Sequence, residues 1–357
     1  MRIAILTSGF TSQNARSFLA PLIRCRRLLE DRGISISLRS APEEIADGPI
    51  LAIDSRAFDP ILDRQPDLAL GLLDRWRRSF ERVVYCDLTD SSTWIRHEVL
   101  PLVTRYAKGQ LPVDRTVLSR PLYGRRLHTD YYHRANAVAD DAPAWGAPLT
   151  STDLAKLAVA WNSGLSNYMP YGPRITDLLG RNGLASWIAA IPIAFHSVDR
   201  ARTIPVSGRF ATRYGRASVA YQRQEVGRRL ELPAKRLSKC AYFRELYRSA
   251  VVLSPFGWGE INQKDFEVFL AGAALLKPDM SHLETWPPLY EPGVTYAAFA
   301  WDFSDLVEQV DRLVADGRTR TALARAGQER YRHYLLSQAA AEEFCDRVAR
   351  LFGAKTD

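Results

Sequence analysis

The chain has 357 residues, of which 46% are hydrophobic and 25% charged, which is typical of a globular protein with room for two hydrophobic cores. This composition excludes a disordered, a collagen-like or a small disulfide-stapled protein. The net charge of +8 is concentrated, because residues 200–248 hold thirteen Lys and Arg against three Asp and Glu. The four cysteines lack metal-ligand spacing and the N-terminus lacks the apolar core of a signal peptide, so we expect a cytoplasmic protein with reduced thiols.

The first 100 residues alternate short β-branched runs with helical patterns, which predicts a parallel sheet flanked by helices. We expect strands at 2–8, 34–39, 50–54 and 82–86 and a helix at 16–31. This pattern is typical of a Rossmann-like half, in which ligands bind at the carboxyl edge of the sheet. The loops at 8–10 and 87–92 follow the first and fourth strands and therefore lie at that edge.

The stretch 101–183 is less regular, and its aromatic and polar clusters, such as residues 121–133, predict either a substrate-side surface or a decorated connection. The apolar run 184–195 falls short of the ~20 residues that span a bilayer. A second alternating pattern begins at residue 203, with strands expected at 203–208, 250–254, 273–277 and 295–299 and helices at 217–230, 264–271, 304–315, 318–333 and 337–352. We therefore predict two α/β domains, at 1–190 and 191–335, and a last segment, 336–357, that packs back on the first domain.

The segment 249–273 carries the most informative motif. A buried strand leads into a loop with Gly257 and Gly259, and a helix follows that has Lys264 in its first turn and Glu267 three residues later. Glycines let the backbone approach a ligand, and a helix start favours an anion such as a pyrophosphate, to which Lys264 adds a positive charge. Glu267 shares that face and can accept hydrogen bonds from ribose hydroxyls. The alternative is a surface ion pair between Lys264 and Glu267.

This segment resembles the donor-nucleotide site of GT-B glycosyltransferases, in particular exostosin-like and bacterial family-1-type enzymes. The pattern of that family falls on Pro255, Gly257, Gly259, Lys264, Glu267, Ala271 and Gly272, and the resemblance continues through residues 275–286 and 301–303. It implies a GT-B fold, with two Rossmann-like domains facing each other across a cleft. It also implies transfer of a sugar from a nucleotide-diphospho-sugar, UDP or GDP before other bases, to a hydroxyl of a glycan or glycolipid in bacterial surface-polysaccharide synthesis.

One departure concerns stereochemistry. Many retaining members of the family place an acidic residue eight positions before the second glutamate, where this chain has Gly259, with Glu260 offset by one. Retention or inversion therefore cannot be carried over. The chain also lacks a clear Asp-x-Asp flanked by apolar residues, so we expect a metal-independent hexosyltransferase with no cofactor, in which Arg, Lys and helix dipoles stabilise the departing diphosphate.

The residues expected to bind the donor follow from the motif and the resemblance: Arg209, Tyr214, Gly257, Gly259, Asn262, Lys264, Asp265, Glu267 and His282. Arg209 follows the glycine turn of the first strand of the donor domain and is a candidate phosphate ligand. Tyr214 is a candidate for stacking on the base. The alternative for the arginines is a solvated basic face.

An inverting transfer needs a general base on the first half, and a carboxylate or histidine facing the cleft would serve. The candidates are Asp87, Asp90, Asp130 and His133, each of which has a structural alternative as a helix cap, a loop ligand or a core hydrogen-bonding group. Trp161 and Asn162, with Asn167 and Tyr168 beyond them, offer stacking and amide contacts to a sugar, although a buried amphipathic helix explains the tryptophan equally well.

Two other interpretations stay open. A catalytically silent GT-B scaffold or sugar-binding protein would keep the nucleotide cradle without a working base. A nucleic-acid-binding protein would explain the basic segment with its interleaved aromatic residues, but no reader motif is present and the diphosphate already accounts for the charge. We therefore expect a nucleotide-sugar and a glycan or glycolipid as partners and no nucleic acid, with the basic helix able to rest on the anionic inner face of a membrane.

Overall fold

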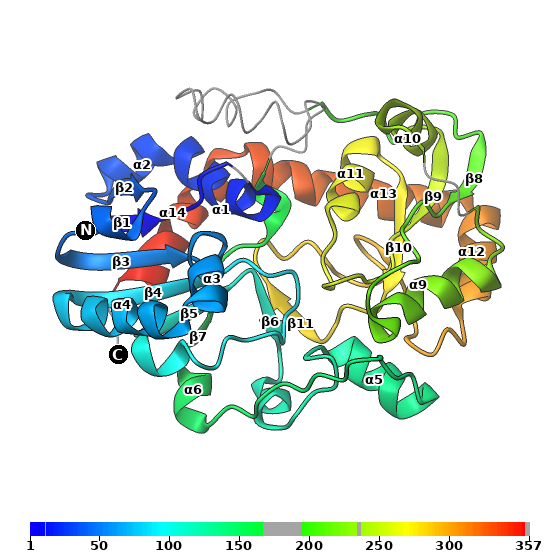
Figure 1. Ribbon diagram of the computed structural model, residues 1–357. Coiled ribbons are helices and arrows are strands. Elements are labelled where there is room, and N and C mark those ends of the chain that lie inside the picture. The colour runs from blue at the N-terminus through cyan, green and yellow to red at the C-terminus, as the bar shows by residue number, and fades with distance from the viewer. Residues whose placement is uncertain (11, 167–193, 234–236, 354–357) are drawn as a thin grey trace.

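The computed structural model describes residues 1–10, 12–166, 194–233 and 237–353, and it contains two parallel sheets that lie side by side (Figure 1). The first belongs to the N-terminal half of the chain and the second to the C-terminal half. This arrangement confirms the predicted α/β class with two Rossmann-like halves.

The N-terminal sheet has the strand order β2-β1-β3-β4-β5-β7, with all neighbours parallel. Its strands are β1 (Arg2–Leu6), β2 (Ser35–Arg39), β3 (Gly48–Asp54), β4 (Phe80–Asp87), β5 (Arg105–Lys108) and β7 (Leu157–Val159). The helices of this half are α1 (Gln13–Arg24), α2 (Arg26–Asp31), α3 (Ser55–Arg64), α4 (Pro66–Ser79) and α6 (Ser151–Lys156). Apolar residues of α1 and of α3 with α4 belong to two different hydrophobic clusters, so the sheet is buried on both faces.

The C-terminal sheet has the order β12-β10-β9-β8 and is also parallel. Its strands are β8 (Ile204–Ser207), β9 (Ser249–Leu253), β10 (Ala274–Pro278) and β12 (Ala297–Phe299). Its helices are α9 (Ala217–Arg229), α10 (Lys239–Leu246), α11 (Gln263–Ala271), α12 (Leu306–Ala315) and α13 (Gly317–Leu336). Helices α11 and α13 pack on one side of the sheet and α12 on the other. Because α11 follows β9 through a short loop, it starts at the carboxyl edge of the sheet.

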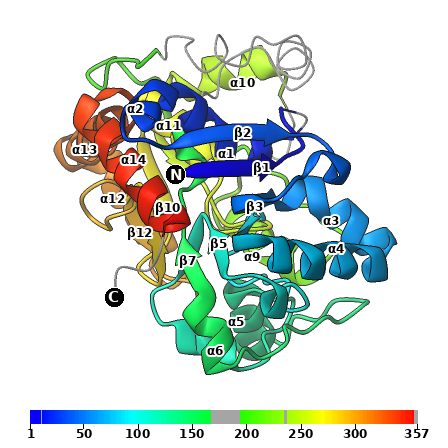
Figure 2. The same cartoon turned by 90° about the vertical axis from the view of Figure 1, so that its left-hand side faces the viewer.

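The two halves are joined by more than one crossing of the chain. Strand β6 (Gln110–Pro112) pairs antiparallel with β11 (Leu283–Thr285), and α5 (Leu127–Asn136) packs on the C-terminal half, where Tyr132 stacks on Phe303. In the other direction, α14 (Gln338–Phe352) returns to the N-terminal half (Figure 2), and Arg105 donates a 2.6 Å hydrogen bond to the Arg350 carbonyl. These crossings fix the position of one sheet edge relative to the other.

Several elements differ from those that the sequence pattern predicts. The single helix expected at 16–31 is two helices that break at Cys25, whose N–H caps α1. The stretch 101–183, expected to be irregular, contributes β5, β6, β7, α5 and α6. The apolar run 184–195 lies almost wholly outside the described residues, and none of the helices described is both long and apolar enough to cross a membrane.

Candidate active site

A cavity of about 370 Å³ lies between the two halves, at the start of α11. We call it the lysine cavity because Lys264 lines it. Its N-terminal side is formed by Asn14, Asp90 and Ser163, and its C-terminal side by Arg209, Phe210, Ala211, Arg223, Ser254, Pro255, Ile261, Asn262, Gln263 and Lys264. The cavity therefore meets both the loop after β4 and the loop after β9, as expected for a ligand site at the carboxyl ends of parallel strands.

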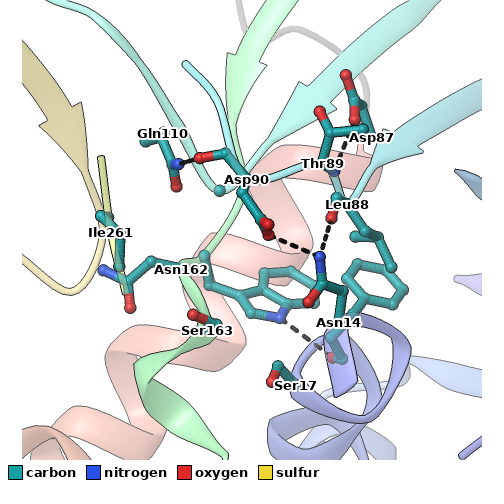
Figure 3. A pocket seen from close by; sticks show the side chains of 13 residues that line it. Asn14, Ser17, Asp87, Leu88, Thr89, Asp90, Gln110, Asn162, Ser163 and Ile261 are labelled. Atoms are coloured by element: carbon teal, nitrogen blue, oxygen red, sulfur yellow. Dashed lines mark hydrogen bonds between the residues drawn. The ribbon is translucent and has the colours of Figure 1, made fainter. Parts of the chain in front are cut away.

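A second cavity, the tryptophan cavity, is lined by Trp161 and is shown in Figure 3. Its volume of about 50 Å³ has room for about three or four water molecules, so it can hold only a small part of a ligand. Four residues line both cavities: Asn14, Asp90, Ser163 and Ile261. The two cavities therefore adjoin at these residues.

Among the residues that the structure describes, two cations of the lysine cavity have no carboxylate partner. Lys264 donates a hydrogen bond to the backbone carbonyl of Arg209, and Arg223 donates to the carbonyl of Phe256 and, at 3.3 Å, to Oδ1 of Asn262. In the described parts of the chain neither forms an ion pair. Burial, and then the charge of Arg223, lowers the pKa of Lys264 from 10.5 to about 7. A partly buried cation without a counter-ion is a site that an anion would stabilise.

Arg223 was not singled out by the sequence. It lies on α9, more than thirty residues before the glycine loop, and nothing in the local pattern separates it from its basic neighbours. In the structure the arginines of this helix are not equivalent. Arg228 and Arg229 pair with Glu225, whereas Arg223 lines the lysine cavity. Only the tertiary packing distinguishes the two kinds of arginine.

Arg209 lines the lysine cavity, but its charge is already compensated. Its guanidinium makes three hydrogen bonds to the carboxylate of Glu245, at 2.9–3.1 Å, and that pair is completed by Ser207. Through its backbone carbonyl Arg209 positions Lys264. The predicted contact of the Arg209 side chain with phosphate therefore competes with an existing ion pair.

Asp265 is a correction to the predicted donor site. Its side chain is fully buried and accepts hydrogen bonds from Ser254 and Tyr290, and it pairs with Lys277 at 3.1 Å. The same carboxylate accepts the N–H of Asn262 at 3.1 Å, which closes the first turn of α11. Asp265 therefore stabilises the helix start and its buried partners, and it lines neither cavity.

The two glycines of the loop are required by protein contacts. A Cβ on Gly259 would lie 1.7 Å from the carbonyl oxygen of Asp90, and one on Gly257 would lie 2.6 Å from Nη2 of Arg223. The glycine spacing predicts close approach of a ligand, whereas the structure shows close approach of Asp90 in the N-terminal half and of Arg223. The loop is in this way seated directly against Asp90.

Three other predicted donor residues lie outside the lining of either cavity. Glu267 accepts a 2.6 Å hydrogen bond from Tyr242, and burial raises its pKa. Tyr214 contacts the Trp258 ring edge-on and lies under the Arg223 guanidinium. His282 contacts the Trp301 ring edge-on, at 4.9 Å. Their roles toward ribose, base and sugar stay predictions.

Among the candidate bases, Asp87 is corrected by its surroundings. Its carboxylate is fully buried and accepts from Lys108 at 2.6 Å and from Tyr106 at 2.7 Å. Burial raises its pKa, but the charge and hydrogen bond of Lys108 outweigh burial, so the net shift is downward. Asp87 lines the tryptophan cavity, but its carboxylate is held ionised by a buried lysine, which makes it a poor proton acceptor.

Asp130 and His133 are also structural residues. Asp130 is buried on α5 and is bonded by Arg120 at 2.8 Å, by Arg134 at 2.9 Å and by the N–H of Tyr123. His133 stacks on Tyr123 with the ring centroids 3.8 Å apart and bonds a backbone carbonyl through Nδ1. Neither residue lines the lysine cavity or the tryptophan cavity. Their helix, α5, packs instead against α9.

Asp90 has the geometry that the other candidates lack. Its side chain is exposed, it lines both cavities, and its Oδ1 accepts a 2.8 Å hydrogen bond from Nδ2 of Asn14 (Figure 3). The same Asn14 amide donates to the carbonyl of Leu88 at 2.6 Å, and Gln110 holds the backbone carbonyl of Asp90. Asn14 belongs to no motif in the sequence, yet from the first turn of α1 it fixes the orientation of the carboxylate.

The remaining predicted sugar contacts are mainly packing residues. Trp161 stacks on Phe18 with centroids 4.9 Å apart and donates to a backbone carbonyl, and Asn162 is buried with its amide on the carbonyl of Pro287. Asn167 and Tyr168 lie outside the described residues.

Glu260, next to the glycine loop, joins the two halves. It is fully buried and accepts from the N–H and the hydroxyl of Ser92, at 3.0 and 2.7 Å. Its side chain therefore ties the donor loop to the loop that carries Asp90. Among the residues that the structure describes, no group of three or more His, Cys, Asp and Glu side chains is arranged to hold a metal ion.

Comparisons with known proteins bear mainly on the C-terminal half of the chain. Residues 197–346 match a family model described as glycosyl transferase-like. A search of curated proteins gave no match. Similar solved structures include an alpha-glucosyltransferase in complex with UDP and a 13-mer DNA (12% identity, 98% of this chain and 99% of that chain covered, TM-score 0.46). Others are the HepE protein of Anabaena in complex with UDP-glucose (11%, 98% and 99%, 0.45) and a glycosyltransferase from Rickettsia africae (7%, 98% and 98%, 0.47).

At these TM-scores the solved structures decide neither fold nor function, and the family match carries the comparison. The matched segment contains Arg209, Arg223 and Lys264, that is, every cation that lines the lysine cavity. The second parallel α/β half and its glycine loop fall in the same segment. Residues 197–346 are therefore similar to a glycosyl transferase-like family, and this match covers most of the segment on which the resemblance in the sequence rests.

Proposed function

We propose that this protein transfers a sugar from a nucleotide-diphospho-sugar to a hydroxyl of a glycan or glycolipid. The observation that carries the proposal is the pair Arg223 and Lys264, which line one cavity at the start of α11 and form no ion pair with any carboxylate in the described part of the chain. A diphosphate supplies the negative charge that this pair lacks. UDP and GDP are the donor nucleotides we expect first.

The opposite wall of the cavity supplies the base. Asp90 accepts the proton of the acceptor hydroxyl as its oxygen bonds to the anomeric carbon of the donor sugar. The bond between that carbon and the β-phosphate oxygen breaks, and its electron pair leaves with the diphosphate. Arg223, Lys264 and the free N–H groups of α11 stabilise the negative charge that develops there. A direct displacement of this kind inverts the anomeric carbon.

Asn14 is a positioning residue in this scheme. Its amide donates to Oδ1 of Asp90 and to the Leu88 carbonyl, so the other carboxylate oxygen is left for the acceptor. The adjoining tryptophan cavity has room for only a few atoms, which fits the hydroxyl-bearing edge of an acceptor. The bulk of the acceptor then extends out of the cleft.

The setting of the reaction is a wider proposal. The resemblance described above supports bacterial surface-polysaccharide synthesis, a hexose as the transferred sugar and a reaction without a metal ion. The excess of basic residues in 200–248 supports a location in the cytoplasm, with this segment in contact with an anionic membrane surface. A glycolipid acceptor would be found at such a surface.

The test is donor affinity, measured by isothermal titration calorimetry with UDP-sugars and GDP-sugars. Replacing a charged donor of a hydrogen bond typically costs about 1.5–3 kcal/mol, so Arg223→Met and Lys264→Met should each weaken binding about 10- to 100-fold. Arg228→Met is the matched control, because it removes an exposed arginine from the same helix. Unchanged affinity in both cavity variants would overturn the proposal. Donor binding without any turnover, even to water, would favour the silent scaffold.

A further inference from the structure

A group of arginines at the rim of the cleft lines neither the lysine cavity nor the tryptophan cavity. Arg125 and Arg126 follow Gly124 in the turn before α5, and Arg216 immediately precedes α9. Arg125 and Arg216 both lie close enough to Arg126 to lower its pKa. Arg126 donates through Nε to the carbonyl of Trp258 at 2.7 Å, and its guanidinium lies over the Trp258 ring, 5.0 Å from the centroid. We call Arg125, Arg126, Arg216 and Trp258 the rim cluster.

The charges of the rim cluster are only partly neutralised, because in the described part of the chain Arg216 alone of its three arginines forms an ion pair, with Asp140. Across the described residues, Arg125 and Arg126 form no ion pair, and the partners of the Arg126 side chain are backbone carbonyls. Arg216 lies 3.6 Å from Asp140, but its buried Nη1 makes no hydrogen bond. The carboxylate of Asp140 already accepts two 2.8 Å hydrogen bonds from Ser218.

The electrostatic consequence appears at Arg126. Burial lowers its pKa from 12.5 to about 10, and the neighbouring arginines add to this effect while Glu260 and Asp90 oppose it. The charged form of the guanidinium is therefore held in an unfavourable environment that a bound anion would improve. Arg forks are well matched to the planar oxygens of carboxylate and phosphate.

The backbone of the turn is built to hold these side chains. Gly124 and Arg125 both have left-handed backbone angles, with φ of 65° and 61°, and for a residue with a side chain that conformation costs roughly 1–2 kcal/mol. The N–H groups of both residues are bonded, to the carbonyls of Ala144 and Leu122. A Cβ on Gly124 would lie 2.5 Å from Oγ1 of Thr129. The turn therefore holds the backbone of Arg125 and Arg126 in a fixed conformation, with the Arg125 guanidinium over the Trp94 ring and that of Arg126 over Trp258.

The position of the cluster points to the acceptor. Trp258 is 42% exposed, and the next residue, Gly259, is seated against the backbone of Asp90. Asp90 lies close enough to Arg126 to act on it electrostatically, yet none of the four rim residues lines the lysine cavity, which has its own cations. An exposed tryptophan beside guanidinium groups also offers a flat surface on which a sugar ring can lie.

We propose that the rim cluster binds an oxyanion of the acceptor, a phosphate or a carboxylate carried close to the hydroxyl that Asp90 deprotonates. This inference rests on the proposed function, and it narrows the acceptor to an anionic glycan or glycolipid. A lipid-linked sugar phosphate and an acidic sugar share the required chemistry, and they differ in which oxyanion they present.

The experiment uses the full chain carrying Lys264→Met and Arg223→Met, so that the lysine cavity no longer holds anions. Inorganic phosphate and glucuronate are titrated calorimetrically into this protein and into the same protein with Arg126→Gln and Arg216→Gln added. We expect at least a fivefold loss of affinity for one or both anions. The matched control is Arg134→Gln, an exposed arginine on α5, which should leave affinity unchanged. Preference for phosphate identifies a phosphate-bearing acceptor, and preference for glucuronate an acidic glycan.

Equal anion affinity with and without Arg126 and Arg216 would overturn the inference. Arg126→Lys, which keeps the charge, should retain part of the binding and excludes loss of folding as the explanation. UDP affinity is measured in Arg126→Gln and Arg216→Gln on the otherwise unchanged chain. If it falls with them, the rim belongs to the donor and the inference fails while the proposed function stands. If Arg223→Met and Lys264→Met leave the UDP affinity unchanged, the proposed function itself fails.

Discussion

Lys264 makes donor binding depend on pH in a direction that the structure fixes. Its pKa is lowered to about 7 by burial and by Arg223, while Glu267 and Asp265 on its own helix act against this shift and Lys277 on β10 adds to it. As the pH rises through 7, the free protein therefore loses the ammonium charge. A diphosphate favours the charged form, so binding raises the pKa again and takes up a proton.

The magnitude follows from the population of the charged form. With a pKa of about 7, Lys264 is about nine-tenths protonated at pH 6 and about one-tenth at pH 8. If the charged form is the one that binds, the apparent Kd scales with the inverse of that fraction, so it rises about tenfold over these two pH units. A nucleotide-sugar is the proper ligand, because its two phosphate groups each keep one charge throughout this range.

The assay is calorimetry of a UDP-sugar or GDP-sugar at pH 6, 7 and 8, in buffers of different ionisation enthalpy so that proton uptake is counted. The chain should take up close to one proton per donor at pH 8. Lys264→Arg keeps a charge at every pH and should flatten the profile, whereas Lys264→Met should flatten it at low affinity. The same slope in Lys264→Arg as in the unaltered chain would refute the reasoning, since another group would then be titrating.

Three further predictions separate the base, the glycine loop and the buried ion pair. Asp90→Asn should lower kcat about 10²- to 10⁴-fold with donor affinity unchanged, because a general base is lost; a steady-state assay in which kcat holds would dismiss Asp90. Gly259→Ala should cost about 1–3 kcal/mol of stability in a urea titration, since a Cβ would clash with the Asp90 carbonyl, while Gly215→Ala, with open space around it, should stay near zero. Asp87→Asn should destabilise the fold by about 3–5 kcal/mol, because it leaves Lys108 buried and unpaired; a loss of activity at full stability would instead restore Asp87 as a catalytic residue.

The repeating pattern of the sequence predicts most of the fold. Buried strands such as 50–54 and 250–254 are short apolar runs bounded by polar turns, and their period survives in β3 and β9. The packing of α5 on the opposite half is not readable in the same way. In the sequence Tyr132 stands among polar residues, so its burial is not expected. Tyr132 is buried because Val226 and Phe303 of the other half pack in the same hydrophobic cluster.

The candidate site divides along the same line. The sequence predicts Lys264 as a donor residue from a contiguous glycine loop and helix start, and the structure places Lys264 in the lining of the lysine cavity. Arg223 and Asn14 cannot be found in this way, since each reaches the cavity from a distant helix. Nor can composition distinguish a carboxylate that meets a ligand from one that neutralises a buried lysine, as Asp265 and Asp87 do.

The most direct test of the central claim is a crystal structure of the protein with a UDP-sugar or GDP-sugar bound. The account predicts the diphosphate in the lysine cavity, with phosphate oxygens about 2.7–3.2 Å from Nζ of Lys264 and from the Arg223 guanidinium, and the sugar directed toward Asp90. A nucleotide bound elsewhere, or one whose diphosphate touches neither cation, would contradict it.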